Sequence, residues 1–135
     1  MTLENKKIMK KLIIDAASEK ILLMLITNDV YSITKENTKI NYEKLTLIIN
    51  DFLISCELKL NDIDKIYLNR GPGSFAGIRN SISIVKAFYL TNKIDHYCYS
   101  IEDFKGENNI KYENIPNLCD KFKIKKNLIN PIYIS

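Results

Sequence analysis

The chain has 135 residues, enough for one domain or for one domain with a short tail. Its 46% hydrophobic content supports a packed core, and a formal charge of +4, carried mainly by Lys, is too mild to indicate direct nucleic-acid binding. Three scattered cysteines and one histidine argue against a disulfide framework or a structural zinc site and favour a reducing compartment. With no long apolar run and no signal-peptide pattern, we expect a cytoplasmic protein without a membrane partner.

The first part of the chain predicts three strands in a meander. Residues 12–15 and 20–27 are apolar runs joined by a tight turn, which favours an antiparallel hairpin. A third strand is expected at 31–34, after a turn signal. Residues 1–10 precede the pattern, and we expect them to be a disordered or non-native start.

From about residue 41 the apolar spacing becomes that of a helix, and a second helix is predicted from Ser74 to about Leu90, after a strand at 65–68. The second helix has two apolar rows. Either both rows are buried between the sheet and a neighbouring helix, or one of them docks a partner. The candidate contact residues on the two helices are Tyr42, Leu45, Ile49, Phe52, Ile78, Ile82, Val85 and Tyr89.

Beyond the second helix the pattern weakens. A fifth strand is expected at 97–99, a polar linker at 103–116, a short helix or strand at 117–126 and a terminal strand at 131–134. The element order β-β-β-α-β-α-β predicts an α/β fold with the mixed sheet of the ribonuclease H-like class, which is also the half-unit of the actin-like ATPase superfamily. We expect one such domain at 11–100 and a short tail at 101–135.

The most distinctive segment lies between the fourth strand and the second helix. Pro72 and Gly73 suit the central positions of a type II turn, with a positive φ at Gly73. Ser74 is then an N-cap, and because no acid occupies the first turn, the helix N-terminus is open to an anion or to a polar group of a partner. The candidate loop residues are Gly71, Pro72, Gly73, Ser74, Phe75, Gly77 and Arg79.

Three catalytic interpretations fail on the residues present. Asp15 ends the first strand, where a two-metal nuclease would keep a carboxylate, but Asn69 and Arg70 stand where further acids are needed. A nucleophile elbow needs glycine two residues either side of its serine, and Ser74 has Pro and Ala there. A metallopeptidase lacks its ligands, since the chain has one histidine, His96. We expect no metal and no cofactor.

The two arginines bracket the loop in a chain otherwise rich in Lys. Their planar guanidinium groups suit a carboxylate or a phosphate. For Arg70 we favour a salt bridge that braces the loop, to Asp15, Glu43 or Asp62. For Arg79 the choice between such a bridge and a ligand contact stays open.

Residues 69–79 resemble the signature of the TsaB (YeaZ) family of threonylcarbamoyladenosine-biosynthesis proteins, a Gly-Pro-Gly-Ser-Phe-Thr-Gly-hydrophobic-Arg run in which Ala76 here replaces Thr. Residues 12–19 are similar to the opening Ile-Asp-Thr-Ala/Ser segment of this family. Residues 41–45 resemble the start of its first helix, with Asn41 in place of histidine, and residues 131–134 resemble its ending. The resemblance covers residues 11–100.

The resemblance implies a non-catalytic scaffold subunit rather than an enzyme. Members of the family pair with the TsaD enzyme through helices of their first domain, and with the ATPase TsaE they serve the transfer of a threonylcarbamoyl group to adenosine next to the tRNA anticodon. The expected partners are therefore a TsaD-like subunit and a TsaE-like ATPase, with tRNA contacted indirectly. Members usually carry a second domain, which here would be much shortened to the segment 101–135.

Two alternatives to the scaffold stay open. The chain could be a nucleotide-binding remnant of the actin-like ATPase superfamily, completed by a partner chain, in which the loop and Arg79 hold a phosphate. It could also form a homodimer through the same two helices.

Overall fold

The computed structural model describes residues 8–133. It contains five strands, four α-helices and three 3-10 turns in this part of the chain. The strands are β1 (Lys11–Asp15), β2 (Lys20–Ile26), β3 (Val30–Glu36), β4 (Lys65–Asn69) and β5 (Asp95–Tyr99). The helices are α1 (Lys39–Glu43), α2 (Leu45–Ser55), α3 (Phe75–Asn92) and α4 (Ile115–Lys121), and the 3-10 turns are Leu60–Asp62, Ile101–Asp103 and Tyr112–Asn114.

The strands form one mixed sheet in the order β3-β2-β1-β4-β5. The first three strands are antiparallel neighbours, and β4 and β5 add parallel to β1. Crossovers through helices make these parallel pairings. The order confirms the predicted mixed sheet of ribonuclease H-like type, with β1 and β4 central and almost wholly buried.

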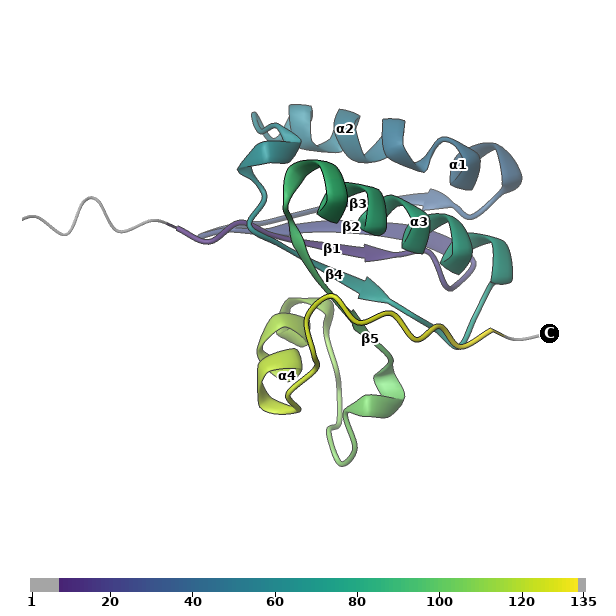
Figure 1. The fold of residues 1–135 in the computed structure, drawn as a ribbon, viewed down its shortest axis with the longest axis vertical. Coiled ribbons are helices and arrows are strands. Elements are labelled where there is room, and N and C mark those ends of the chain that lie inside the picture. The colour runs from purple at the N-terminus through teal and green to yellow at the C-terminus, as the bar shows by residue number, and fades with distance from the viewer. Residues whose placement is uncertain (1–7, 134–135) are drawn as a thin grey trace, which may run out of the picture.

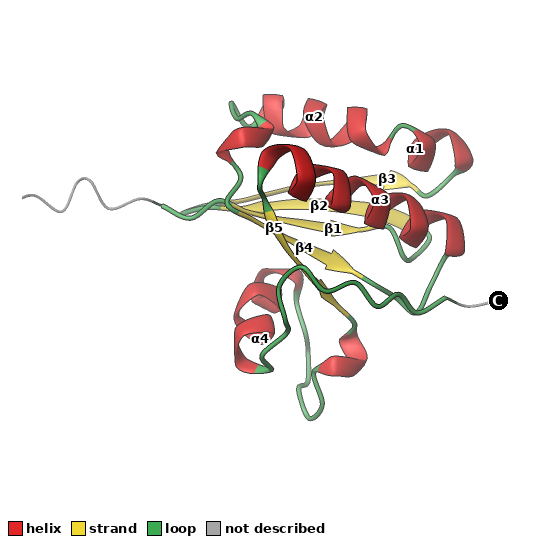
Figure 2. Ribbon diagram, viewed as in Figure 1, coloured by secondary structure: helices red, strands yellow, loops and turns green. Residues whose placement is uncertain are grey.

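Helices α1, α2 and α3 cover one face of the sheet, as Figures 1 and 2 show. The apolar rows of α2 and α3 are buried against alternate residues of the strands, including Leu12 and Leu23. The second row of α3, which includes Ser81 and Phe88, is buried as well. Burial within the chain, the simpler of the two sequence interpretations, therefore accounts for most of both rows, while Phe75 and Tyr89 stay exposed.

The opposite face of the sheet is covered by residues 101–122, which include α4 (Figure 1). Phe104, Ile115 and Leu118 pack there against Ile13 and other residues of the sheet. Parallel strands need both faces covered, because their apolar side chains point to both sides. The segment expected as a polar linker and tail thus forms the second layer of the core, and the α4 helix decides the helix-or-strand alternative left open at 117–126.

The last part of the chain returns along the outer edge of β5. Lys126 forms an isolated antiparallel bridge with Tyr97, and the Ile132 N–H donates to the Arg70 carbonyl at 2.8 Å. In place of a terminal strand there is a single parallel bridge between Gly73 and Tyr133. Ile134, the last residue of the expected strand, lies outside the described residues. So do residues 1–7, which belong to the start that we expected to be disordered.

Candidate functional site

The glycine-rich loop between β4 and α3 differs from the expected type II turn. Gly71, not Gly73, has the positive φ, at 110°, and the Gly71–Pro72 peptide bond is cis. Gly73 is required for another reason, because a Cβ there would collide with the Ala17 carbonyl. Gly77 is required in the same way by the Ala16 carbonyl. The glycines therefore let the loop and the start of α3 lie directly against the β1–β2 turn.

Ser74 caps α3 as predicted, and this role uses its hydroxyl. Its Oγ accepts from the Gly77 N–H at 3.2 Å, and its own N–H donates to the Ala17 carbonyl at 2.8 Å. The first turn of α3 carries no acid. An open pocket of about 460 Å³ adjoins this end of the helix and is lined by Ala17, Ser18, Glu19, Asn37, Gly73 and Ser74. Glu19 places a carboxylate in the pocket and opposes an anion there.

Asp15 is buried and fully engaged in hydrogen bonds. Its two oxygens accept from the Ala17 N–H at 3.0 Å, the Asn69 amide at 3.1 Å and the Tyr112 hydroxyl at 2.7 Å. Asn69 in turn accepts from the Gly71 N–H at 2.9 Å. Burial, together with the Asp15 carboxylate, raises the pKa of Tyr112, so the phenol stays a donor. The carboxylate at the end of β1 thus ties the loop to the C-terminal part of the chain.

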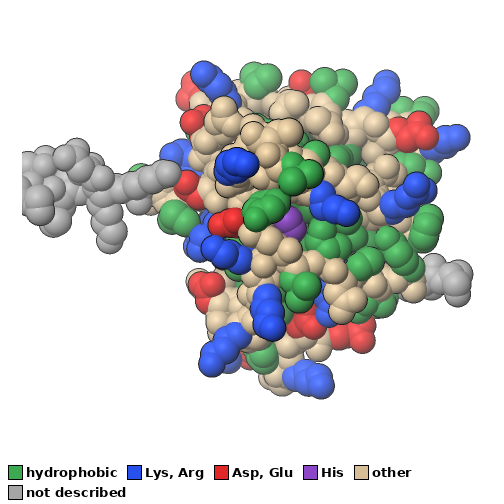
Figure 3. Space-filling model, in the orientation of Figure 1, with side chains coloured by type: hydrophobic (Ala, Val, Ile, Leu, Met, Phe, Trp, Pro, Cys, Tyr) green, Lys and Arg blue, Asp and Glu red, His purple; other side chains and the backbone are tan. Residues whose placement is uncertain are grey.

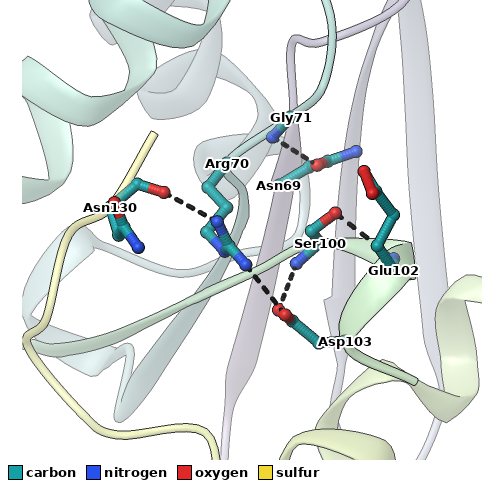
Figure 4. A network of polar contacts seen from close by, with 7 residues as sticks. All are labelled: Asn69, Arg70, Gly71, Ser100, Glu102, Asp103 and Asn130. Atoms are coloured by element: carbon teal, nitrogen blue, oxygen red, sulfur yellow. Dashed lines mark hydrogen bonds and ion pairs between the residues drawn. The ribbon is translucent and has the colours of Figure 1, made fainter. Parts of the chain in front are cut away.

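Arg70 braces the loop, but through partners other than those expected. Figure 4 shows its guanidinium between Asp103 and the backbone of Asn130. The Nη2–Oδ1 distance to Asp103 is 2.8 Å, and Nη1 donates to the Asn130 carbonyl at 2.8 Å. Asp103 also accepts from the Ser100 N–H at 2.8 Å. A salt bridge was predicted correctly, and Asp15, Glu43 and Asp62 were the wrong partners.

Arg79 and His96 lie apart from these networks. Arg79 is exposed on α3 and makes no ion pair with any residue that the structure describes. His96 is only 2% exposed, on the edge strand β5, and its ring meets Tyr89 edge-on at a centroid distance of 5.7 Å. Neither ring nitrogen has a hydrogen-bond partner. Burial lowers the pKa of His96, an effect that Asp95 partly opposes.

The helical contact residues expected from the sequence divide into two groups. Six are buried in the core of the chain itself and are closed to a partner in this structure: Leu45, Ile49, Phe52, Ile78, Ile82 and Val85. Tyr42 is partly exposed, and Tyr89 is 40% exposed. The outward side of the helices instead shows Ile40, Leu47, Ile54 and Leu90, each more than half exposed. This corrects the residues of the expected surface, because helical spacing identifies an apolar face without saying what covers it.

Sequence reasoning missed Tyr112 and Asn37. Asn37 donates from Nδ2 to the carbonyls of Ala16 and Ser18 at 2.9 and 2.7 Å, and so holds the β1–β2 turn against the start of α1. No local pattern marks either residue, because their partners lie far away along the chain.

Within residues 8–133 no group of three His, Cys, Asp or Glu side chains is placed to hold a metal ion. None of the helices in this range has the length and apolar character needed to cross a membrane.

Fold and loop together define the class: an α/β protein of the ribonuclease H-like type with a glycine-rich strand-to-helix loop. The model of the family described as "TsaD: tRNA N6-adenosine threonylcarbamoyltransferase" matches residues 35–105, which is just over half of the chain. The chain belongs to this family, and it is similar to the relatives below, which are named TsaB and YeaZ.

A curated relative is the tRNA threonylcarbamoyladenosine biosynthesis protein TsaB of Buchnera aphidicola subsp. Schizaphis graminum. It is 32% identical over 65 residues, which are 48% of this chain and 31% of the relative. Among solved structures, YeaZ from Pseudomonas aeruginosa superposes with a TM-score of 0.63 at 22% identity, over 68% of this chain and 44% of that one. A second structure, titled as an uncharacterized protein similar to peptidase YEAZ from Pseudomonas aeruginosa, has the same TM-score and identity and is covered to 43%. The chain thus spans less than half the length of these relatives.

Proposed function

We propose that this chain is a non-catalytic, cytoplasmic scaffold subunit that binds a TsaD-like enzyme for threonylcarbamoylation of adenosine next to the tRNA anticodon. A TsaE-like ATPase joins the same larger complex, and tRNA is contacted through these partners. Family membership supports the proposal, since the curated relative is named for the biosynthesis of this modified nucleoside.

The observation that carries the proposal is the apolar surface on the outside of the helical layer. Ile40 of α1, Leu47 and Ile54 of α2, and Leu90 of α3 are 56–69% exposed. A groove of about 380 Å³ runs between α1–α2 and α3, and Tyr42, Ile84 and Phe88 are among the residues that line it. Exposed apolar side chains on helices that flank a groove fit a protein interface.

The polar groups nearest the loop support a structural role. The Ser74 hydroxyl serves as a cap, Asp15 accepts three hydrogen bonds, and Arg70 is paired with Asp103. A nucleophile, base or metal ligand has to direct a lone pair at a substrate or an ion, and the hydrogen bonds that Ser74 and Asp15 accept come from groups within the fold.

The test is co-purification with the TsaD-like subunit from the same genome, followed by titration calorimetry. We expect a complex, and the double variant Leu47→Asp, Leu90→Asp should weaken it at least about tenfold, since a charge is costly in a buried apolar contact. Ser32→Asp, on exposed β3, is the matched control. A chain that stays alone with this subunit, or a double variant that behaves like the control, would contradict the proposal.

A second candidate function is nucleotide binding completed by a partner chain. It is favoured by the pocket at the N-terminus of α3, where the backbone N–H groups of Phe75 and Ala76 have no acceptor within the helix. Calorimetry with ATP and with ADP, with and without the TsaD-like subunit, tests it. Heat of binding that Glu19→Gln strengthens would favour this function, and absence of binding in both settings would exclude it.

A further inference from the structure

One stripe along α3 combines two regular series of side chains. Residues seven positions apart in a helix lie on the same side, two turns along the axis. The apolar series is Phe75, Ile82 and Tyr89, and the cationic series is Arg79, Lys86 and Lys93. The two series alternate in steps of four and three, which is the spacing of a coiled-coil seam. We call these six residues the α3 stripe.

The stripe faces outward for most of its length. Phe75 is 53% exposed and Tyr89 is 40% exposed, while Ile82 between them is 8% exposed and belongs to the core rather than to the contact surface. Arg79, Lys86 and Lys93 are all exposed. The series runs from the first residue of α3 to its C-cap, about 27 Å at the rise of an α-helix.

Among the described residues the cations of the stripe are unpaired, and Asp95, two residues after Lys93, is paired with Lys126 instead. Helix α3 contains no Asp or Glu anywhere between Phe75 and Asn92. Within the described part of the chain, none of the three cations belongs to an ion pair. Three unpaired cations along one line create a positive potential, and the surface that complements it is acidic.

The C-terminal part of the chain borders the stripe and widens its apolar surface. Tyr133 packs against Phe75 at a centroid distance of 4.7 Å and is 41% exposed. At the other end, the Asn127 side chain accepts from the backbone N–H of His96, whose ring contacts Tyr89, and Ile129 packs partly buried against the helix-side core. Figure 3 shows hydrophobic side chains gathered between α3 and this segment.

From the spacing, the exposure and the charge, we propose that the α3 stripe seats an amphipathic helix of the partner protein, with apolar and carboxylate side chains that repeat every seven residues. This rests on the proposed function and adds the chemistry of the partner surface. A second copy of this chain does not fit, because two stripes would bring six cations together without an acid from either α3. At about 1.5 Å per residue, the seat accommodates a helix of roughly 18 residues.

The test measures affinity for the TsaD-like subunit by calorimetry at low and at high salt. The double variant Arg79→Glu, Lys86→Glu should bind at least about tenfold more weakly at low salt, and the difference should shrink at high salt, where exposed charges are screened. The variant Phe75→Ser, Tyr89→Ser should weaken binding at both salt concentrations. The control Lys35→Glu, Lys105→Glu changes net charge equally at exposed sites outside the stripe. Thermal melts verify that each variant folds.

The outcomes separate this inference from the proposed function. If the wild type binds and the stripe variants bind as tightly as the control, the inference about the stripe is wrong and the scaffold proposal is unaffected. Failure of the wild type to bind removes both. A homodimer that the stripe variants dissociate, or direct tRNA binding that they abolish while partner affinity stays intact, also overturns the inference.

Discussion

The carboxylate of Asp15 accepts hydrogen bonds from three parts of the chain that are far apart in sequence. Ala17 belongs to the turn after β1, Asn69 to the end of β4, and Tyr112 to the 3-10 turn before α4. Each donor offsets part of the cost of burying a charge. At the scale of single residues, this one side chain therefore joins the loop, the sheet and the C-terminal layer.

Replacement of Tyr112 by Phe tests this role. The variant keeps the ring but removes one donor to a buried carboxylate, so we expect the free energy of unfolding to fall by about 1 to 2 kcal/mol. Urea unfolding followed by circular dichroism measures the change. Tyr31→Phe, at an exposed position on β3, is the control and should change little. Equal losses in the two variants would show that the hydrogen bond to Asp15 contributes nothing.

Residue-level features of the loop could be predicted only in part. The cap at Ser74 and the absence of an acid in the first turn follow from the order of residues along the chain, and the structure confirms both. Two other features do not follow from that order: the positive φ lies at Gly71 and not at Gly73, and Arg70 pairs with Asp103. They depend on where residues 100–132 lie, which turn propensities do not contain.

At the scale of elements, α3 shows why apolar rows alone do not identify an interface. The middle of both rows is buried within the chain, because the sheet lies beneath the helix and α1–α2 lie beside it, whereas Phe75 and Tyr89 at the two ends are exposed. The outward side carries the cations and the exposed aromatic residues of the stripe. The repeat of cations every seven residues was present in the sequence, but its meaning required knowing which side faces solvent.

Residues 101–133 form the element whose removal should matter most. Without them, Ile13, Met24, Tyr67 and Tyr99 would lose their cover on the second face of the sheet. Burial of such side chains contributes roughly 1.5 to 3 kcal/mol each, so a chain cut after Ser100 should lose its cooperative unfolding transition and bind a hydrophobic dye. Thermal melts and dye fluorescence measure this, with Ile101→Ser at an exposed position as the control. A cooperative transition in the shortened chain would show that the second layer is dispensable.

At the scale of the whole molecule, His96 is the one histidine, so it alone introduces a histidine contribution to the pH dependence of stability. Burial lowers its pKa in the folded state, and Asp95 opposes this in part. As the pH falls below about 6.5, the histidine is therefore protonated in the unfolded chain before it is protonated in the folded one. The free energy of unfolding decreases as the pH falls further.

The variant His96→Phe checks this dependence. It retains an aromatic ring against Tyr89 and cannot titrate, so its stability should fall less than that of the wild type between about pH 7.5 and 5.5. The difference between the two curves cancels the shared contribution of the carboxylates. Denaturant unfolding at several pH values provides both curves. Parallel curves would mean that the buried ring does not resist protonation.

Short apolar runs, helical spacing and the loop residues were enough to predict the strands, the two main helices, the mixed sheet and the family resemblance, because each depends on residues close together in the chain. Only the folded structure showed what covers the second face of the sheet, which groups pair with Asp15 and Arg70, and which side of α3 faces solvent. Tyr112 and Asp15 are 97 positions apart, and such a contact forms only when strands and layers have met. Local patterns show which side chains avoid water, whereas packing determines what covers them.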